Sequence, residues 1–392
     1  MYEDVTPGLV WQAPGRRSEV FACATVRREL IYAISCAAAV EPNAHISANL
    51  VTDLITSNGT VHDAISTAER PRRDMRYPPV TVLIAAYNAE PTIERALASA
   101  WRQNYPEMEV IVVDDHSTDN TAIRAEKLAR GNFRLIRLEK NRGVSGALNA
   151  GIREARTDYV AFLDSDDEWL DSKLIKQLPI IDGHPDMTLI ACGGESVDPT
   201  GRVFDTFGLE LPPYSSREFW RALLVKTYFS RTAVVARRTK LLAVGGFDET
   251  LRISEDQDMW IKLASTGETG FVKEILVRVH DVPDSLGARF GEREAEFTLP
   301  MIRRHLAHLA SRLSKREVRQ ILGRRYGATG RNIYALGRLG GGAALVIRAV
   351  LLGDRPLENL GYLVSAAPPT IRLKRHFRRC GSSNGETVDH SR

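Results

Sequence analysis

Short apolar runs alternate with helix-like segments through the middle of this chain. Four short runs of mainly apolar residues are typical of buried strands: 80–86, 109–113, 133–138 and 159–163. Three segments between them carry apolar residues on one helical face: 91–101, 121–129 and 147–155. Strands and helices that alternate at this spacing indicate right-handed crossovers and an α/β fold with a mostly parallel central sheet flanked by helices.

Polar residues stand at the end of several of these strands. Tyr87-Asn88 follows the first strand, Asp114-Asp115 the second, and Asp164-Ser-Asp-Asp167 the fourth. In parallel α/β sheets, ligands bind beyond the carboxyl ends of the strands. The pattern therefore predicts a binding site at this edge of the sheet, built from segments that lie far apart in the sequence.

The carboxylates after the fourth strand are the strongest chemical signal. Carboxylates this close repel one another and resist burial unless a cation or hydrogen-bond donors compensate them. Side chains alternate along an extended backbone, so Asp164 and Asp166 are expected to face the same side. Two hard oxygen ligands at one spot suit Mg²⁺ or Mn²⁺. The alternative is a solvated acidic turn that caps a helix at Trp169.

The α/β pattern continues to residue 286, and the two ends of the chain differ from it. The later elements of the pattern are a helix near Leu174, a strand at 187–192, a helix at 254–263 and a last strand at 271–279. Residues 1–78 predict a helical extension that ends in a linker rich in Pro and Arg. Residues 380–392 predict a disordered tail.

Residues 287–379 predict a basic helical region. Its expected helices are Met301–Leu313, Lys315–Tyr326, Asn332–Leu339, Ala343–Leu352 and Leu357–Ala366. From Met301 to Arg379 there are 17 Lys or Arg residues and three acidic residues, whereas the whole chain has a net charge of +4. In the segment Arg372–Arg379, basic and apolar residues interleave in a pattern suited to an anionic membrane surface. The alternative is a solvated charged face. Nucleic acid is not an expected partner, because no recognition motif accompanies the charge.

Composition narrows the class of protein. Apolar residues make up 43% and charged residues 26% of the 392 residues, as in ordinary soluble proteins. No apolar run reaches the length of a membrane span. The longest apolar run near the start, 30–40, comes after charged residues and does not lie at the terminus, so a cleaved signal peptide is not expected. The four cysteines share no metal-ligand or disulfide spacing, which favours a reducing compartment.

Six motifs give the chain a resemblance to a known family. They are Thr81-Val-Leu-Ile-Ala-Ala-Tyr-Asn88, Val113-Asp-Asp-His-Ser-Thr-Asp-Asn-Thr121, Asn141-Arg-Gly-Val-Ser-Gly-Ala-Leu-Asn-Ala-Gly151, Phe162-Leu-Asp-Ser-Asp-Asp167, Gly245-Gly-Phe-Asp-Glu249 and Glu255-Asp-Gln-Asp-Met-Trp260. In this order they resemble the family 2 glycosyltransferases, whose nucleotide-binding domain has the GT-A fold. The resemblance implies such a domain at residues 79–286. His116 stands where the family usually has Gly, a departure that concerns the local turn.

The resemblance implies a role for each motif. The residues implied in nucleotide-sugar binding are Ala85, Tyr87, Asp115, Arg142 and Asp164. Asp166 would bind the cofactor, Mn²⁺ or Mg²⁺, together with Asp164 and His280. Asp256 matches the catalytic base, which takes a proton from the acceptor hydroxyl. Its neighbour Glu255 is expected to raise the pKa of Asp256.

Each of these assignments has a structural alternative. Asp115 could cap a strand end, and His280 could be a structural residue. The acidic residues from Glu255 to Asp258 could be a first helical turn favoured by the helix dipole. Trp260 could belong to the core or could form a platform for the acceptor.

The resemblance implies an inverting, metal-dependent glycosyltransferase. The donor would be a nucleotide-diphosphate sugar, with a UDP-sugar favoured, and the acceptor a hydroxyl of a glycan or lipid-linked molecule in bacterial surface polysaccharide synthesis. The Gln-x-x-Arg-Trp signature of processive synthases is absent, which favours one sugar per encounter. The alternatives are transfer to a polyprenyl phosphate and a catalytically silent nucleotide-sugar-binding scaffold. The expected location is the cytoplasm, at the inner face of the cell membrane.

Overall fold

The structure is a computed structural model that describes residues 77–211, 215–281 and 293–365. Three sequence-based predictions lie outside the described residues: the helical extension before residue 77, the basic segment Arg372–Arg379 and the disordered tail. Among the residues that the structure does describe, no helix is both long and apolar enough to cross a membrane.

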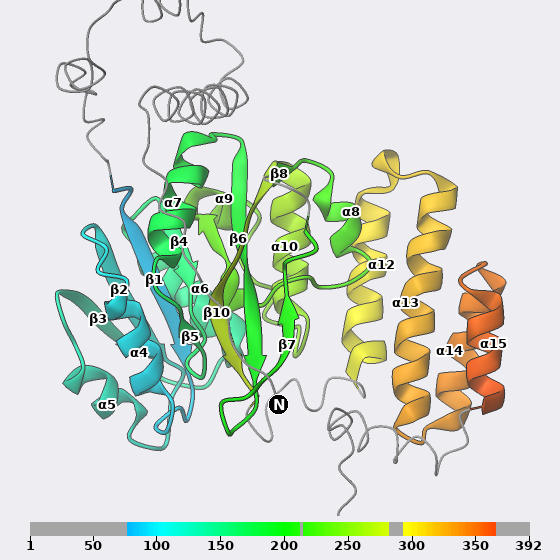
Figure 1. Cartoon of the computed structure of the whole chain (residues 1–392), viewed down its shortest axis with the longest axis horizontal. Coiled ribbons are helices and arrows are strands. Elements are labelled where there is room, and N and C mark those ends of the chain that lie inside the picture. The colour runs from blue at the N-terminus through cyan, green and yellow to red at the C-terminus, as the bar shows by residue number, and fades with distance from the viewer. Residues whose placement is uncertain (1–76, 212–214, 282–292, 366–392) are drawn as a thin grey trace, which may run out of the picture. The chain divides into compact units, whose positions relative to one another are not determined.

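The described residues contain a ten-stranded mixed sheet (Figure 1). Eight of its strands follow the order β3-β2-β1-β4-β9-β6-β10-β5, and the other two are β7, which pairs with β6, and β8, which pairs with β10. The strands are β1 (Val80–Ala86), β2 (Met108–Asp114), β3 (Asn132–Arg137), β4 (Tyr159–Phe162), β5 (Glu168–Trp169), β6 (Met187–Val197), β7 (Val203–Phe207), β8 (Ser215–Ser216), β9 (Val235–Arg237) and β10 (Glu268–His280).

The long pairings in this sheet are parallel, which confirms the predicted mostly parallel architecture. β1 pairs in parallel with β2 and β4, β2 with β3, and β6 with β10. The short strand β9 runs antiparallel between β4 and β6 and so joins the two parallel halves. Because both faces are covered, the central strands are largely apolar; Val82, Leu83 and Ile84 in β1 are fully buried.

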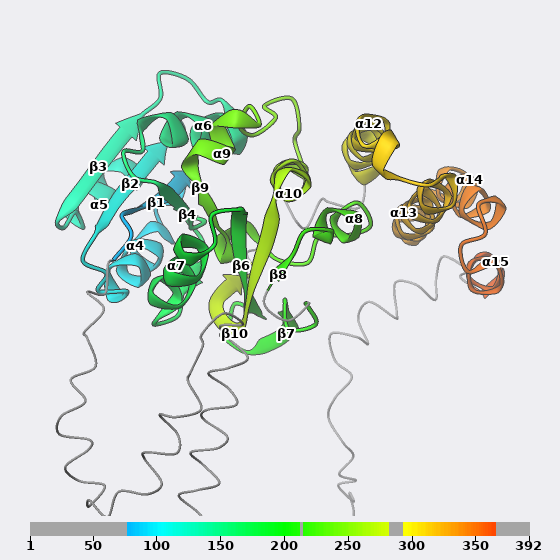
Figure 2. The same cartoon turned by 90° about the horizontal axis from the view of Figure 1, so that it is seen from above.

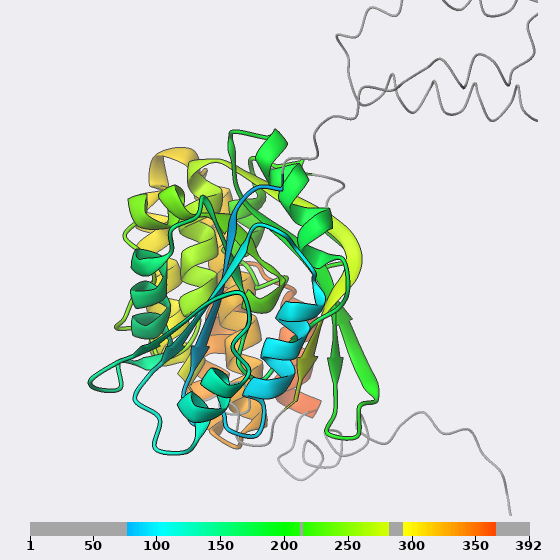
Figure 3. The same cartoon turned by 90° about the vertical axis from the view of Figure 1, so that its left-hand side faces the viewer.

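Helices cover both faces of the sheet, so the layers are helix, sheet and helix (Figures 2 and 3). On one face lie α4 (Ile93–Arg102) and α7 (Lys173–Gly183). On the other lie α6 (Gly143–Glu154), α9 (Arg238–Ala243) and α10 (Glu255–Thr266). The remaining helices of this region are α5 (Thr121–Lys127) and α8 (Phe219–Leu223).

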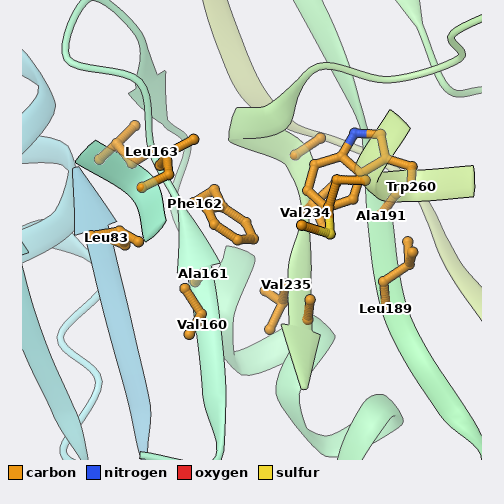
Figure 4. Close-up of a cluster of buried hydrophobic side chains, with 14 of the residues drawn as sticks. Leu83, Val160, Ala161, Phe162, Leu163, Leu189, Ala191, Val234, Val235 and Trp260 are labelled. Carbon is orange, nitrogen blue, oxygen red and sulfur yellow. The ribbon is translucent and has the colours of Figure 1, made fainter. Parts of the chain in front are cut away.

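An aromatic cluster joins the sheet to α10 (Figure 4). The ring of Phe162 on β4 meets the rings of Phe247 and Trp260 edge-on, each at a centroid distance of 5.7 Å. Trp260 is fully buried. It therefore belongs to the core, and the idea that it forms an acceptor platform is wrong. Its packing fixes the helix whose first turn carries Asp256.

The C-terminal helices are α12 (Leu299–His308), α13 (Lys315–Ala335), α14 (Leu339–Leu351) and α15 (Pro356–Ser365). The prediction of a break between Tyr326 and Asn332 is wrong, because α13 runs through this segment without interruption. The glycines there serve helix packing. A Cβ on Gly330 would lie 2.8 Å from the backbone N of Val346, and one on Gly342 would lie 2.5 Å from the backbone N of Tyr334. Glycine thus lets α13 and α14 approach closely.

Candidate active site

The loops after β1 and β2 are bound to each other at the carboxyl edge of the sheet. The backbone N–H of Asp115 donates to the Ala86 carbonyl at 2.8 Å, and Asn88 Oδ1 accepts from the backbone N–H of Thr118 at 2.9 Å. This places the predicted residues Ala85, Tyr87 and Asp115 on adjacent strand ends. The Tyr87 side chain is 51% exposed and is therefore free to contact a ligand.

Asp115 is buried and already holds part of the site together. Its Oδ1 accepts a hydrogen bond from the backbone N–H of Arg142 at 2.7 Å, at the start of α6. Burial raises the pKa of the Asp115 carboxyl. The Arg142 guanidinium lies 2.9 Å from Glu249 and so forms an ion pair with the Gly245–Glu249 motif. Asp115 and the backbone of Arg142 therefore lie together, whereas the Arg142 side chain pairs with Glu249.

Three carboxylates converge at the end of β4. Asp164, Asp166 and Asp167, hereafter the strand-end cluster, have ligand atoms within 4.8 Å of one another. Burial, followed by repulsion from Asp164, raises the pKa of Asp166, and the same two effects raise that of Asp167 further. Trp169 lies in strand β5 and not at a helix start, so the alternative of a helix-capping acidic turn is wrong. Converging oxygen ligands that are short of positive charge fit a hard divalent cation.

Asp167 is the member of this cluster that the sequence reasoning left without a role. It is buried; its Oδ2 accepts from the Thr232 hydroxyl at 2.7 Å, and its Oδ1 accepts from the backbone N–H of His280 at 3.2 Å. Both oxygens therefore have protein donors. Asp167 anchors the cluster to neighbouring strands and leaves Asp164 and Asp166 as the candidate ligands.

His280 reaches the cluster mainly through its backbone. Its ring Nε2 lies 3.5 Å from Glu168 Oε1. Burial and the nearby charge of Arg95 lower the pKa of His280, which favours the neutral imidazole that a metal ligand requires. Arg95 itself donates from Nη2 to the backbone carbonyl of Asp166. The structure thus brings His280 beside Asp167 and turns its ring toward Glu168.

Arg231 is a site residue that the sequence reasoning missed. It lies on a 3₁₀ turn, Arg231–Ala233, and its side chain is 14% exposed. Its Nε donates to Asp164 Oδ1 at 2.7 Å, and its Nη1 donates to Glu255 Oε1 at 3.0 Å. One guanidinium therefore joins the strand-end cluster to the start of α10. A lone Arg in the otherwise uncharged stretch 229–236 is the sequence signal, since a buried charge needs a partner.

The start of α10 carries the second acidic group, Glu255, Asp256 and Asp258, hereafter the helix-start cluster. From Ile253 to Trp260 every residue is buried except Asp256, which stays partly accessible. Burial of the rest of its side chain, and then the charge of Glu255, raise the pKa of Asp256 to about 7. The predicted direction is confirmed, although burial is the larger cause. A carboxyl with this pKa is suited to accept a proton near neutral pH.

This chain is similar in sequence to proteins of a known family. Residues 81–241 match the family model described as Glycosyl transferase family 2. The chain is 33% identical over 207 residues to the succinoglycan biosynthesis protein ExoO of Rhizobium meliloti, covering 48% of this chain and 56% of the relative. It is 27% identical over 233 residues to the amylovoran biosynthesis glycosyltransferase AmsE of Erwinia amylovora, covering 58% and 85%.

A third relative is matched over a shorter region, and one solved structure shares the fold. The chain is 35% identical over 102 residues to the UDP-Glc:alpha-D-GlcNAc-diphosphoundecaprenol beta-1,3-glucosyltransferase WfgD of Escherichia coli, covering 26% of this chain and 40% of that protein. The crystal structure of S. aureus TarS 1-349 in complex with UDP-GlcNAc matches with a TM-score of 0.55 and 20% identity, covering 77% of this chain and 87% of that one.

Proposed function

The chain belongs to glycosyl transferase family 2 over residues 81–241, and on that premise we propose that it is an inverting, metal-dependent glycosyltransferase. It moves one sugar at a time from a nucleotide-diphosphate sugar, with a UDP-sugar favoured, to an acceptor hydroxyl. One observation carries the proposal: converging carboxylates at the strand ends face, across Arg231, a single accessible carboxyl with a raised pKa. That arrangement supports a cation site with a proton acceptor beside it.

The donor would occupy the carboxyl edge of the sheet. Ala85, Tyr87 and Asp115 would contact the base and ribose, and Arg142, at the start of α6, would lie beside them. Asp164 and Asp166 would hold Mn²⁺ or Mg²⁺, with His280 as a further candidate ligand. When bound, the cation supplies positive charge against the negative charge that develops on the departing nucleoside diphosphate.

Asp256 would act as the base. Its accessible carboxylate takes the proton of the acceptor hydroxyl as the hydroxyl oxygen attacks the anomeric carbon and the nucleoside diphosphate leaves. A single displacement of this kind inverts the configuration at that carbon. A carboxyl tuned for proton transfer favours a hydroxyl acceptor over a polyprenyl phosphate, which needs no strong base. The presence of both acidic clusters also disfavours a silent scaffold.

The relatives indicate the class of acceptor. Two of them are named for the synthesis of succinoglycan and amylovoran, and a third for transfer of glucose to a diphosphoundecaprenol-linked sugar. We infer that this chain also builds a bacterial surface polysaccharide on a glycan or lipid-linked acceptor. A lipid-linked acceptor would bring the protein to the cytoplasmic face of the cell membrane.

A panel of nucleotide sugars tests the proposal. The purified chain is incubated with UDP-, GDP-, dTDP- and CMP-sugars, with Mn²⁺, with Mg²⁺ or with excess EDTA, and release of the free nucleotide is measured. We expect release from one class of diphosphate sugar, dependent on a divalent cation. Equal release in EDTA would refute metal dependence, and a lack of release or of nucleotide binding across the whole panel would refute the enzyme.

Membrane contact has support from α14 and α15. The exposed large apolar residues there include Ile347 at 47%, Leu351 at 74%, Leu357 at 86% and Leu360 at 46%. They follow one another at spacings of four and three residues within each helix, so each pair shares a face. Exposed basic residues, Arg348 and Arg355, lie near them. Apolar side chains flanked by arginine suit the interface of an anionic bilayer.

Vesicle flotation tests this contact. We expect the double variant Leu351→Ser, Leu357→Ser to bind vesicles of anionic phospholipid several-fold less than wild type, because about 0.8 kcal/mol is lost for each buried CH₂ that leaves the bilayer. Nucleotide release from a soluble donor should not change. The matched control is Ile123→Ser, which removes a 51% exposed side chain on α5 instead. Equal flotation of the double variant and wild type would rule out this face.

A further inference from the structure

The N-terminus of α10 is held from outside the helix. Its N-cap, Ser254, has a left-handed backbone with φ 62° and makes no side-chain capping hydrogen bond to α10. Its hydroxyl instead meets the Thr298 hydroxyl at 2.7 Å, and both residues are buried. A left-handed conformation is unfavourable for a residue other than glycine. The contact with Thr298 helps to keep Ser254 in this conformation.

One helical turn later, Asp258 is held in a similar way. The side chain is fully buried, and its Oδ1 accepts a hydrogen bond from His305 Nε2 at 2.8 Å. Its Oδ2 lies 2.6 Å from Lys262 Nζ within the same helix. Burial alone would raise the pKa of Asp258, but the hydrogen bond from His305 and the charge of Lys262 outweigh it and lower the pKa to about 2. Asp258 therefore stays ionised and bonded to α12.

The two contacts have matching helical geometry. Thr298, at the N-cap of α12, and His305 are seven residues apart, which places them two turns apart on one face. Ser254 and Asp258 are four residues apart, one turn of α10, and Asp256 lies between them in the sequence. α12 is also the C-terminal helix that lies nearest to α10 (Figures 1 and 2). α12 thus contacts Ser254 and Asp258, which lie on either side of Asp256 in the sequence, and Asp256 itself stays partly accessible.

A third connection reaches the same turn from α13. Gln257 Nε2 donates to the Leu223 carbonyl at the end of α8. Arg325 Nη2 donates to the same carbonyl at 3.2 Å, and Arg325 Nε donates to the Leu224 carbonyl at 2.8 Å. Arg325 is buried. The C-terminal helices therefore contact Ser254 and Asp258 directly, and Gln257 through α8.

We infer that α12 is a positioning element for Asp256, and that Thr298 and His305 act on the base through Ser254 and Asp258. The inference rests on the proposed function, because it takes Asp256 as the base. Both residues are buried and so are not positioned to contact a substrate. Both fix the direction in which the Asp256 carboxylate points, and a misplaced catalytic group loses rate without loss of donor binding.

The test uses the hydroxyl of Thr298. Thr298→Val keeps the shape and removes the hydroxyl, Thr298→Ser restores it, and His305→Ala breaks the second contact independently. The control is Ser314→Ala, which removes the capping box of α13 and so weakens the same C-terminal region without touching α10. For each variant we would measure amide hydrogen exchange of residues 255–259, affinity for UDP with Mn²⁺, and release of nucleotide from the donor that wild type uses fastest.

We expect Thr298→Val and His305→Ala to exchange faster at residues 255–259 and to lose about 10- to 100-fold in turnover with unchanged UDP affinity. Thr298→Ser and Ser314→Ala should match wild type in turnover. Wild-type exchange and turnover in Thr298→Val would overturn the inference, as would equal loss of turnover in Ser314→Ala. If wild type itself releases no nucleotide from any donor, the proposed function fails. The positioning of the α10 turn is then judged by the exchange rates alone.

Discussion

The strand-end cluster and the helix-start cluster both contact Arg231, yet the carboxylates of the two clusters have different surroundings. In the strand-end cluster the ligand atoms converge within 4.8 Å, and burial with mutual repulsion raises the pKa of Asp166 and Asp167. In the helix-start cluster, each of the two other acidic residues has a partner of opposite charge. Glu255 pairs with Arg231 at 3.0 Å, and Asp258 with Lys262 at 2.6 Å.

This difference separates two kinds of chemistry that the residue types alone do not. The three converging carboxylates repel one another even with Arg231 paired to Asp164, and a bound cation would relieve the repulsion of all of them at once. Asp256, whose pKa is raised by burial and by the charge of Glu255, can instead exchange a proton near neutral pH. The same residue type, aspartate, therefore serves as candidate metal ligand in one cluster and as candidate base in the other.

The largest effect is expected from Asp166→Asn in the strand-end cluster. The substitution keeps the size of the side chain and removes one anionic ligand. Turnover should fall to background, and the affinity for nucleotide sugar should fall only in the presence of Mn²⁺ or Mg²⁺. Calorimetry with UDP, with and without the cation, separates these two effects.

Asp171→Asn is the matched control for that variant, because the Asp171 side chain is 80% exposed and lies five residues further along the chain. It should behave as wild type. If Asp166→Asn kept full turnover, or if it weakened UDP binding equally in EDTA, the strand-end cluster would not be a cation site and the contrast between the clusters would disappear.

Asp256→Asn should have the next largest effect. It keeps the shape and hydrogen bonding of the side chain and removes its basicity, so turnover should drop roughly 10²- to 10⁴-fold, the usual contribution of general-base catalysis. The affinities for UDP and Mn²⁺ should stay near wild type, unlike those of Asp166→Asn. Loss of donor affinity in step with turnover would instead place Asp256 among the donor ligands.

The strand ends show how far sequence reasoning reaches. Asp115, Asp164 and Asp166 were predictable, because a buried apolar strand that runs directly into acidic residues fixes both the fold and the edge at which those residues collect. Arg231 was not, because it lies 67 residues after its partner Asp164. Its segment has no helical or strand periodicity to show which way the guanidinium points. A charge in an apolar stretch predicts that a partner exists, and only the fold identifies the partner.

The C-terminal region shows a different limit. Glycines at 327 and 330 predicted a break, because glycine lowers helix propensity when a helix is considered alone. In the folded protein Gly330 allows the backbones of α13 and α14 to approach closely, and packing outweighs propensity. The contacts of Thr298 and His305 with α10 also depend on this packing. The sequence shows where Thr298 and His305 stand in the chain, but it does not show that they contact Ser254 and Asp258.

The last and smallest effect concerns the pH dependence of Asp256, and it uses two variants of opposite sign. The charge of Glu255 raises the pKa of Asp256 and the charge of Arg231 lowers it. The base must be deprotonated, so kcat/KM should rise with pH through the pKa of Asp256 in the free enzyme, which burial places at about 7. Glu255→Gln should therefore move this acidic limb to lower pH, and Arg231→Gln should move it to higher pH.

Because the two variants should shift the acidic limb in opposite directions, the test distinguishes a change in the pKa of Asp256 from a general loss of stability. A variant that only loosened the fold would lower the rate at every pH and would leave the limb in place. Thermal unfolding of both variants at pH 7 gives the amount of such damage. The substitution Arg231→Gln also leaves Asp164 without its partner, and the freed negative charge acts in the same direction by raising the pKa of Asp256. If the acidic limb moved in the same direction in both variants, or if the wild-type limb lay near the ordinary aspartate pKa of 3.8, another group would determine the pH dependence of kcat/KM. The helix-start cluster would then not be the source of the base.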